Sequence, residues 1–148
     1  MDAVKAAAAD NGERTIGIFS MGAAASAGAA QVSEPVVGWL VCIKGPHIGE
    51  SFPLFAGRNS LGRGAENRIR LTKDQKVSRE KCMEVIYEPK NREFFVRPAG
   101  GSEIIYVDGK MLSDMQKIES KEQIEIGAGL YILVALCGKD FSWEDYIQ

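Results

Sequence analysis

From Val36 onward the sequence consists of short β-type segments separated by turn residues roughly every 8–12 positions. Apolar and polar residues alternate clearly in residues 83–87 and again in residues 124–126. This alternation is expected for strands that bury one face. About ten such strands within roughly 110 residues are enough for a two-sheet sandwich with a core of its own. We therefore expect an all-β sandwich whose sheets are antiparallel or mixed.

The turn residues predict where the strands end. The segment from Gly45 to Gly49 predicts a hairpin, and because His47 lies in this turn we expect it to be exposed. Asp108 and Gly109 both tolerate positive φ, which predicts a tight hairpin turn with no role in binding a ligand. The expected strands cover residues 37–43, 51–55, 59–62, 68–71, 83–88, 93–97, 104–107, 123–126 and 130–136.

Composition divides the chain into three parts. Residues 1–34 are rich in Ala and Gly, which predicts a flexible tail. Residues 35–138 carry the strand pattern, and residues 139–148 form an acidic, aromatic extension that we expect to make one helical turn. The tail has four acidic and two basic residues and so carries the whole net charge of −2, leaving the remainder neutral. A neutral domain predicts no general affinity for nucleic acid.

Several functional classes are disfavoured by composition. No apolar run approaches the roughly 18 residues of a membrane span, and the first residues lack the pattern of a secretory signal, so we expect a cytoplasmic protein that does not bind membranes. His47 is the single histidine, which disfavours histidine-based catalysis and two-histidine metal sites. Cys42, Cys82 and Cys137 lie far apart, so we expect reduced, buried thiols and neither a disulfide framework nor a zinc site. We expect no cofactor.

Four short motifs occur in a distinctive order. They are Ser60–Arg63 (SLGR), Val77–Arg79 (VSR), Tyr106–Gly109 (YVDG) and Ile124–Gly127 (IEIG), each at a strand end or a turn. Together they resemble the forkhead-associated (FHA) domain family over residues 37–136, about two-thirds of the chain. The resemblance implies an eleven-stranded β-sandwich whose loops at one end bind a phosphothreonine peptide. It is closest in type to small bacterial proteins that consist of a single FHA domain.

The resemblance assigns candidate binding residues. Arg63 matches the phosphate-binding arginine of the family, and Ser78 matches the serine that donates its hydroxyl to the phosphate. Arg79 either supports the phosphate or contacts the peptide backbone, and Ser102 falls where the family often places a hydroxyl near the phosphate. A phosphate carries about −1.5 to −2 charges at pH 7, so an arginine fork with hydroxyl and backbone donors suits its three oxygens.

Two positions depart from the family pattern. The family has a histidine three residues after the serine, where this chain has Lys81; a one-residue insertion would place Cys82 there instead. We prefer the second register, because it directs Met83, Val85 and Tyr87 to one face and keeps Glu84 out of the core. In that register Cys82 replaces the histidine as a small hydrophobic residue, and the hydrogen bond that the histidine makes in the family is lost.

The second departure is Glu103, which stands where the family has an asparagine that grips the peptide. A carboxylate there cannot donate a hydrogen bond to a peptide carbonyl, and it repels phosphate. Glu103 is therefore expected to change how the site selects its peptide.

These features predict an adaptor rather than an enzyme. We expect it to bind threonine-phosphorylated proteins in a Ser/Thr kinase pathway. Thr15, with Ile18 three residues later, is a candidate phosphorylation site through which the tail would bind its own domain or a second copy. The alternative is a degenerate FHA fold that acts as a phosphate-independent scaffold, for example in a secretion or division complex. Glu103 and the missing histidine favour that alternative.

Overall fold

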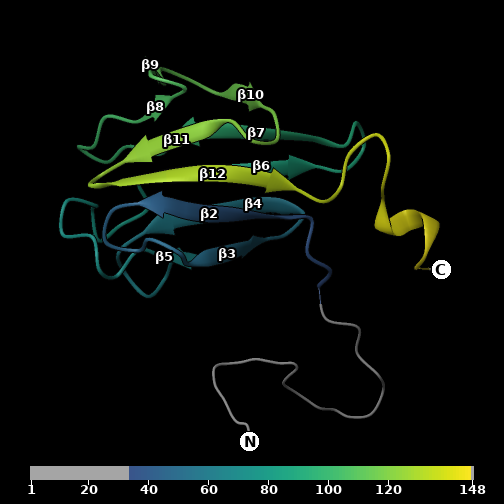
Figure 1. The fold of residues 1–148 in the computed structure, drawn as a ribbon, viewed down its shortest axis with the longest axis horizontal. Coiled ribbons are helices and arrows are strands. Elements are labelled where there is room, and N and C mark those ends of the chain that lie inside the picture. The colour runs from purple at the N-terminus through teal and green to yellow at the C-terminus, as the bar shows by residue number, and fades with distance from the viewer. Residues whose placement is uncertain (1–33, 148) are drawn as a thin grey trace, which may run out of the picture. The chain divides into compact units, whose positions relative to one another are not determined.

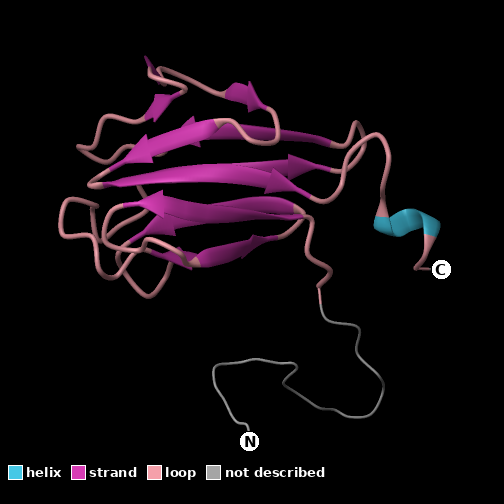
Figure 2. Cartoon of the chain, viewed as in Figure 1, coloured by secondary structure: helices cyan, strands magenta, loops and turns pink. Residues whose placement is uncertain are grey.

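The computed structural model describes residues 34–147, in which two β-sheets pack face to face (Figure 1). Among these residues nearly all regular structure is strand, with a single short helical turn near the C-terminus (Figure 2). The all-β sandwich predicted from the strand pattern is confirmed, with eleven strands in the described region. Thr15 lies outside the described residues.

The first sheet has five strands and is mixed. Its pairs are antiparallel except for β4 and β5, which run parallel where Leu61 pairs with Ile69 and Gly62 with Arg70. A parallel pair cannot be joined by a tight hairpin, so the chain makes a loop between these two strands. In spatial order the strands are β10 (Gln116–Ile118), β7 (Glu93–Pro98), β6 (Met83–Glu88), β4 (Gly57–Gly62) and β5 (Ile69–Arg70).

The second sheet has six strands, and all of its pairs are antiparallel. A register shift between Leu130 and Tyr131 interrupts the pairing of its two longest strands. In spatial order the strands are β3 (Ser51–Leu54), β2 (Gly38–Lys44), β12 (Gly129–Ala135), β11 (Gln123–Ile126), β8 (Tyr106–Val107) and β9 (Lys110–Met111).

Alternate residues of each long strand point between the sheets and form the core. The strand β6 buries Met83, Val85 and Tyr87 on one face, the face that its alternation predicts. All three cysteines are free and buried. The most deeply buried side chains from the two sheets include Leu40, Leu54, Leu61, Ile69, Val85, Val96, Ile124, Ile126, Tyr131 and Leu133.

The hairpin between β8 and β9 has the predicted turn. Asp108 and Gly109 have φ values of 49° and 82°, and Tyr106 pairs with Met111 across them. Two residues with positive φ match the right-handed twist of the flanking strands. The expected strand over residues 104–107 is shorter in the structure, and β9 and β10 are strands that the sequence pattern did not predict.

The segment after β12 returns to the edge of the core. A 3-10 helix at Trp143–Asp145 begins after Ser142, whose hydroxyl accepts a hydrogen bond from the Glu144 amide. Phe141 and Trp143 pack against the core, and the Trp143 Nε1 donates to the Val36 carbonyl at 2.6 Å. No helix within residues 34–147 is long and apolar enough to span a bilayer.

Candidate functional site

The loops that carry the predicted site residues lie at one end of the sandwich. They are the loop between β4 and β5 (residues 63–68), the loop between β5 and β6 (residues 71–82) and the loop between β7 and β8 (residues 99–105). In Figure 1 they gather at the left, opposite the C-terminal segment. The fold therefore brings Arg63, Ser78 and Glu103 to one end although they are spread over 40 positions of the sequence.

Arg63 is anchored by both its backbone and its side chain. Its amide donates to the Ser78 carbonyl at 2.8 Å, and its Nε donates to the Val77 carbonyl at 3.0 Å. The two terminal nitrogens of the guanidinium make no hydrogen bond within residues 34–147. The side chain is thus held in one orientation, with the two terminal NH2 groups of the charged guanidinium still available for a ligand.

The residue before Arg63 has to be a glycine. A Cβ on Gly62 would lie 2.4 Å from the Asn67 Nδ2 and 2.4 Å from the Glu80 carbonyl oxygen. Carbon does not approach nitrogen or oxygen so closely. The Gly62–Arg63 pair of the sequence motif therefore has a physical basis: the glycine lets two loops close around the end of β4, and that closure positions the arginine.

Asn67 ties the same two loops together. It is buried, and its Nδ2 donates to the Gly64 carbonyl at 3.1 Å and to the Arg79 carbonyl at 3.3 Å. The Gly64 amide also donates to the Arg79 carbonyl at 2.8 Å. Asn67 is not among the predicted site residues, because no local sequence pattern separates a buried asparagine from an exposed one in a polar loop.

Asp74 connects the Ser78 loop to the second sheet. It is fully buried, and its Oδ2 accepts from the Ala128 amide at 2.9 Å in the turn between β11 and β12. Its Oδ1 accepts from the Lys76 amide at 3.0 Å. Hydrogen bonds to a carboxylate are stronger than neutral ones. Asp74, which is also not among the predicted site residues, is therefore the main polar anchor of residues 71–82.

The expectation that His47 is exposed is wrong. Its exposed fraction is 2%, because the loop between β2 and β3 folds against the Ser78 loop. The His47 Nε2 accepts from the Lys73 amide at 3.1 Å, so Nδ1 carries the proton and donates to Glu50 at 3.0 Å. The ring also packs edge-on against Phe52. His47 thus positions a loop of the site and has no ring nitrogen left for catalysis or metal binding.

Ser78 is contacted by the loop that precedes β8. The Glu103 Oε2 accepts a hydrogen bond from the Ser78 amide, and the other carboxylate oxygen, Oε1, is buried with no hydrogen-bond partner. Gly101 lies against both residues: a Cβ there would be 2.3 Å from the Glu103 Oε1 and 3.1 Å from the Ser78 Oγ. The carboxylate of Glu103 is therefore folded into the site rather than extended into solvent.

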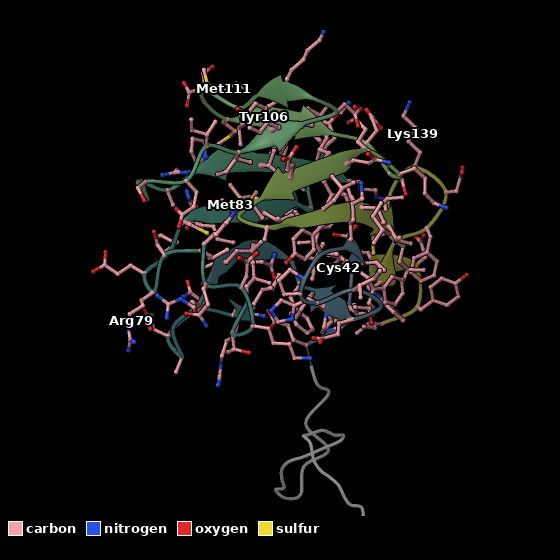
Figure 3. The ribbon with its side chains drawn as sticks, turned by 60° about the vertical axis from the view of Figure 1, so that its left-hand side comes forward. Cys42, Arg79, Met83, Tyr106, Met111 and Lys139 are labelled. Atoms are coloured by element: carbon pink, nitrogen blue, oxygen red, sulfur yellow. The ribbon has the colours of Figure 1, made fainter. Side chains whose placement is uncertain are left out.

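Arg79 and Ser102 leave their side chains free. Both residues are exposed, and neither side chain makes a hydrogen bond to another residue in the described region. The Arg79 side chain points away from the body of the domain (Figure 3). Together with Arg63 and the Ser78 hydroxyl they supply unused donors and two positive charges at this end of the molecule.

Cys82 takes the buried position at the start of β6, and Lys81 is exposed, as in the preferred register. The Cys82 thiol makes a hydrogen bond of its own, which it donates to the Leu61 carbonyl at 3.1 Å. Burial and the negative charge of Glu103 raise the pKa of this thiol to about 12. A thiol with that pKa stays protonated at neutral pH, so Cys82 is structural rather than nucleophilic.

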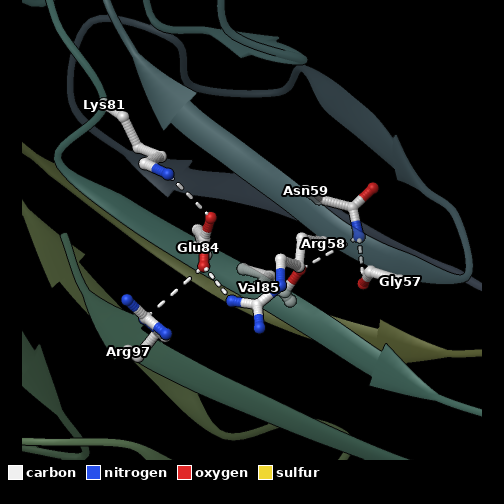
Figure 4. Close-up of polar contacts among 7 residues, drawn as sticks. All are labelled: Gly57, Arg58, Asn59, Lys81, Glu84, Val85 and Arg97. Atoms are coloured by element: carbon white, nitrogen blue, oxygen red, sulfur yellow. Dashed lines mark hydrogen bonds and ion pairs between the residues drawn. The ribbon is translucent and has the colours of Figure 1, made fainter.

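Glu84 is buried, although on the opposite face from Met83 and Val85. The preferred register correctly keeps Glu84 out of the core, but Glu84 is not exposed, because three cations cover its carboxylate on the outer face of the first sheet (Figure 4). Arg58 lies 3.1 Å and Lys81 2.9 Å from its oxygens, and Arg97 lies 3.5 Å away. Burial opposes ionisation, but the hydrogen bonds from Lys81 and Arg58 outweigh it and lower the pKa of Glu84.

Comparison with known proteins is consistent with this geometry. The family model of the FHA domain matches residues 59–127, a range that includes Arg63, Ser78 and Glu103. A search of curated proteins finds no match.

Solved structures share the fold at low sequence identity. The FHA domain of the CT664 protein from Chlamydia trachomatis is 21% identical with a TM-score of 0.60, over 66% of this chain and 96% of that one. The FHA domain of a hypothetical protein from Arabidopsis thaliana is 19% identical with a TM-score of 0.59, over 80% and 100%. The N-terminal FHA domain of S. cerevisiae Rad53p, in complex with a phosphothreonine peptide, is 12% identical with a TM-score of 0.58, over 68% and 94%.

Proposed function

This chain belongs to the FHA domain family, whose members are interaction modules known for phosphothreonine-dependent binding, and we propose that it is a phosphothreonine-peptide-binding adaptor. The observation that carries the proposal is the anchored guanidinium of Arg63, whose two free NH2 groups lie beside the loop of Ser78. In this proposal the partners are threonine-phosphorylated proteins, and a Ser/Thr protein kinase creates the ligand. The three free thiols suit the reducing cytoplasm.

Four of the five predicted site residues contact the ligand in this proposal. Arg63 forms charge-assisted hydrogen bonds to two phosphate oxygens, and the Ser78 hydroxyl donates to the phosphate. Arg79, whose guanidinium is free, supports the phosphate or contacts the peptide backbone, and the Ser102 hydroxyl reaches the phosphate from the other side. Because the Arg63 Nε is already bound to the Val77 carbonyl, little side-chain entropy remains to be lost on binding.

Fluorescence anisotropy of the full chain tests the proposal. The probes are labelled phosphothreonine peptides and their unphosphorylated forms. Arg63→Ala should weaken phosphopeptide binding about 10- to 100-fold, because a hydrogen bond to a charged group contributes roughly 1.5–3 kcal/mol. The control Lys90→Ala removes one positive charge in the turn between β6 and β7, at the far end of these strands, and should leave affinity within twofold. Equal affinity for phosphorylated and unphosphorylated peptides, or for wild type and Arg63→Ala, refutes the proposal.

The phosphate-independent scaffold is the second candidate function. It is favoured by Glu103, whose carboxylate accepts the hydrogen bond of the Ser78 amide, and by Cys82, which stands in the place of the family histidine. In the same assay a scaffold would bind no phosphopeptide and would be unaffected by Arg63→Ala.

We further propose that Thr15 is phosphorylated and binds the domain of its own chain or of a second copy. A phosphopeptide spanning residues 10–21 in the anisotropy assay tests this directly. Tight binding of this peptide that is abolished by Arg63→Ala supports self-regulation. If this peptide does not bind while other phosphopeptides do, the proposal of self-regulation through Thr15 is refuted.

A further inference from the structure

The carboxylate of Glu103 lies where an anionic ligand of this site would bind. Its Oε2 accepts from the Ser78 amide, and Ser78 also offers its hydroxyl and lies beside the anchored backbone of Arg63. Glu103 is thus an internal anion placed among the donors that a phosphate needs.

This arrangement leaves Glu103 itself poorly satisfied. Its Oε1 is buried and accepts no hydrogen bond, and Gly101 packs directly against that oxygen. A buried polar atom without a partner is rare in native proteins, and its desolvation has a cost that water would relieve. When Glu103 leaves the site, water can hydrate its Oε1. This hydration offsets part of the free energy lost when the hydrogen bond between Glu103 and the Ser78 amide breaks.

From this geometry we infer that Glu103 determines specificity by competing with the ligand for the Ser78 amide, so that the site admits a phosphate dianion and rejects a carboxylate. The inference rests on the proposed function and concerns the charge of the ligand. It places Glu103 in the site as a competitor, whereas the family's asparagine at this position grips the peptide.

Charge explains the selection. An aspartate or glutamate on a peptide would exchange one carboxylate for another at the Ser78 amide, and it would also have to overcome the high effective concentration of a group on the same chain. A phosphate carries about −1.5 to −2 charges and has a third oxygen. Its interactions with Arg63 and the Ser78 hydroxyl are therefore stronger than the interactions of the carboxylate that it displaces. We therefore expect phosphomimetic peptides not to bind the wild-type protein.

Two variants of the full chain separate the effects of charge and contact. Glu103→Ala removes the competitor, and Glu103→Gln keeps an oxygen for the Ser78 amide but removes the charge. The control Glu80→Gln removes an exposed carboxylate from the same Ser78 loop, and Glu80 has no ion pair in the described structure. Each protein is titrated with a phosphothreonine peptide and with the same peptide carrying glutamate instead.

We expect Glu103→Ala to bind the phosphopeptide about tenfold more tightly than wild type and to acquire measurable affinity for the glutamate peptide. Glu103→Gln should lie between the two, and Glu80→Gln should match wild type. Unchanged discrimination between the two peptides in Glu103→Ala overturns the inference, even where both proteins bind phosphopeptide and the proposed function holds.

A second readout does not depend on any peptide. The Ser78 amide is followed by nitrogen-15 NMR during titration with inorganic phosphate. In Glu103→Ala its resonance should shift at a phosphate concentration about tenfold lower than in wild type. Identical titrations of the two proteins overturn the inference. If no peptide binds either protein but the Ser78 resonance responds as expected, the proposed peptide ligand fails while the competition by Glu103 stands.

Discussion

Replacing Asp74 with alanine tests whether one buried carboxylate holds the Ser78 loop. The substitution removes the acceptors of two backbone amides, those of Ala128 at 2.9 Å and Lys76 at 3.0 Å. The hydrogen bond to Ala128 joins residues 54 positions apart, so its loss separates the loop from the turn between β11 and β12.

The size of the effect follows from these two contacts. A hydrogen bond to a buried charged group contributes about 1.5–3 kcal/mol, and the Lys76 amide, in an exposed residue, recovers part of its loss by binding water. Asp74→Ala should therefore lower the free energy of unfolding by about 3 kcal/mol. With a urea slope of about 2 kcal/mol/M for a domain of this size, the unfolding midpoint should fall by roughly 1.5 M.

Urea unfolding followed by tryptophan fluorescence measures this change. The matched control is Asp114→Ala, which removes an exposed carboxylate that also accepts from a backbone amide, that of Met115 at 2.8 Å. That control should move the midpoint by less than about 0.3 M, because water replaces the lost bond. A midpoint for Asp74→Ala within 0.5 M of the control, on the order of 1 kcal/mol, would show that Asp74 does not anchor the loop.

Three further predictions concern the same end of the fold and the first sheet. Gly62→Ala should lower the free energy of unfolding by about 1–3 kcal/mol, measured by urea unfolding, and weaken phosphopeptide binding, because the new methyl group meets Asn67 and the Glu80 carbonyl. Because the pKa of Glu84 is lowered in the folded state, its ionised form stabilises the fold at pH values above the ordinary carboxyl pKa. This stabilisation is lost as the pH falls through the folded-state pKa. Glu84→Gln should therefore show a smaller drop in urea midpoint between pH 7 and pH 4 than wild type. The Cys82 thiol, with its raised pKa, should react with a thiol reagent only on unfolding, and reaction in the native protein at the rate of a free thiol would contradict its burial.

Much of the fold was predictable because it depends on neighbouring residues in the chain. The strand β6 matches the predicted residues 83–88 and β11 the predicted residues 123–126, since both alternate with a period of two. The turn at Asp108 follows from residues that tolerate positive φ. The strands β9 and β10 were missed because they are only two and three residues long and too short to show alternation.

The site was predictable only in part. The motifs placed Arg63 and Ser78, which the fold brings together through the hydrogen bond from the Arg63 amide to the Ser78 carbonyl. They did not identify Asn67 or Asp74, whose partners lie in other loops. Nor did they predict the contact between Glu103 and the Ser78 amide, which spans 25 positions of sequence.

Most strand positions and the hairpin turns follow from the sequence, because each depends on residues close together along the chain. Which polar residues are buried depends on contacts between elements that are distant in the sequence. His47 is buried because two loops meet over it, and Glu84 is buried because Arg58 and Arg97 reach it from the neighbouring strands β4 and β7. A polar side chain leaves water only where partners surround it, and here those partners come from distant parts of the sequence.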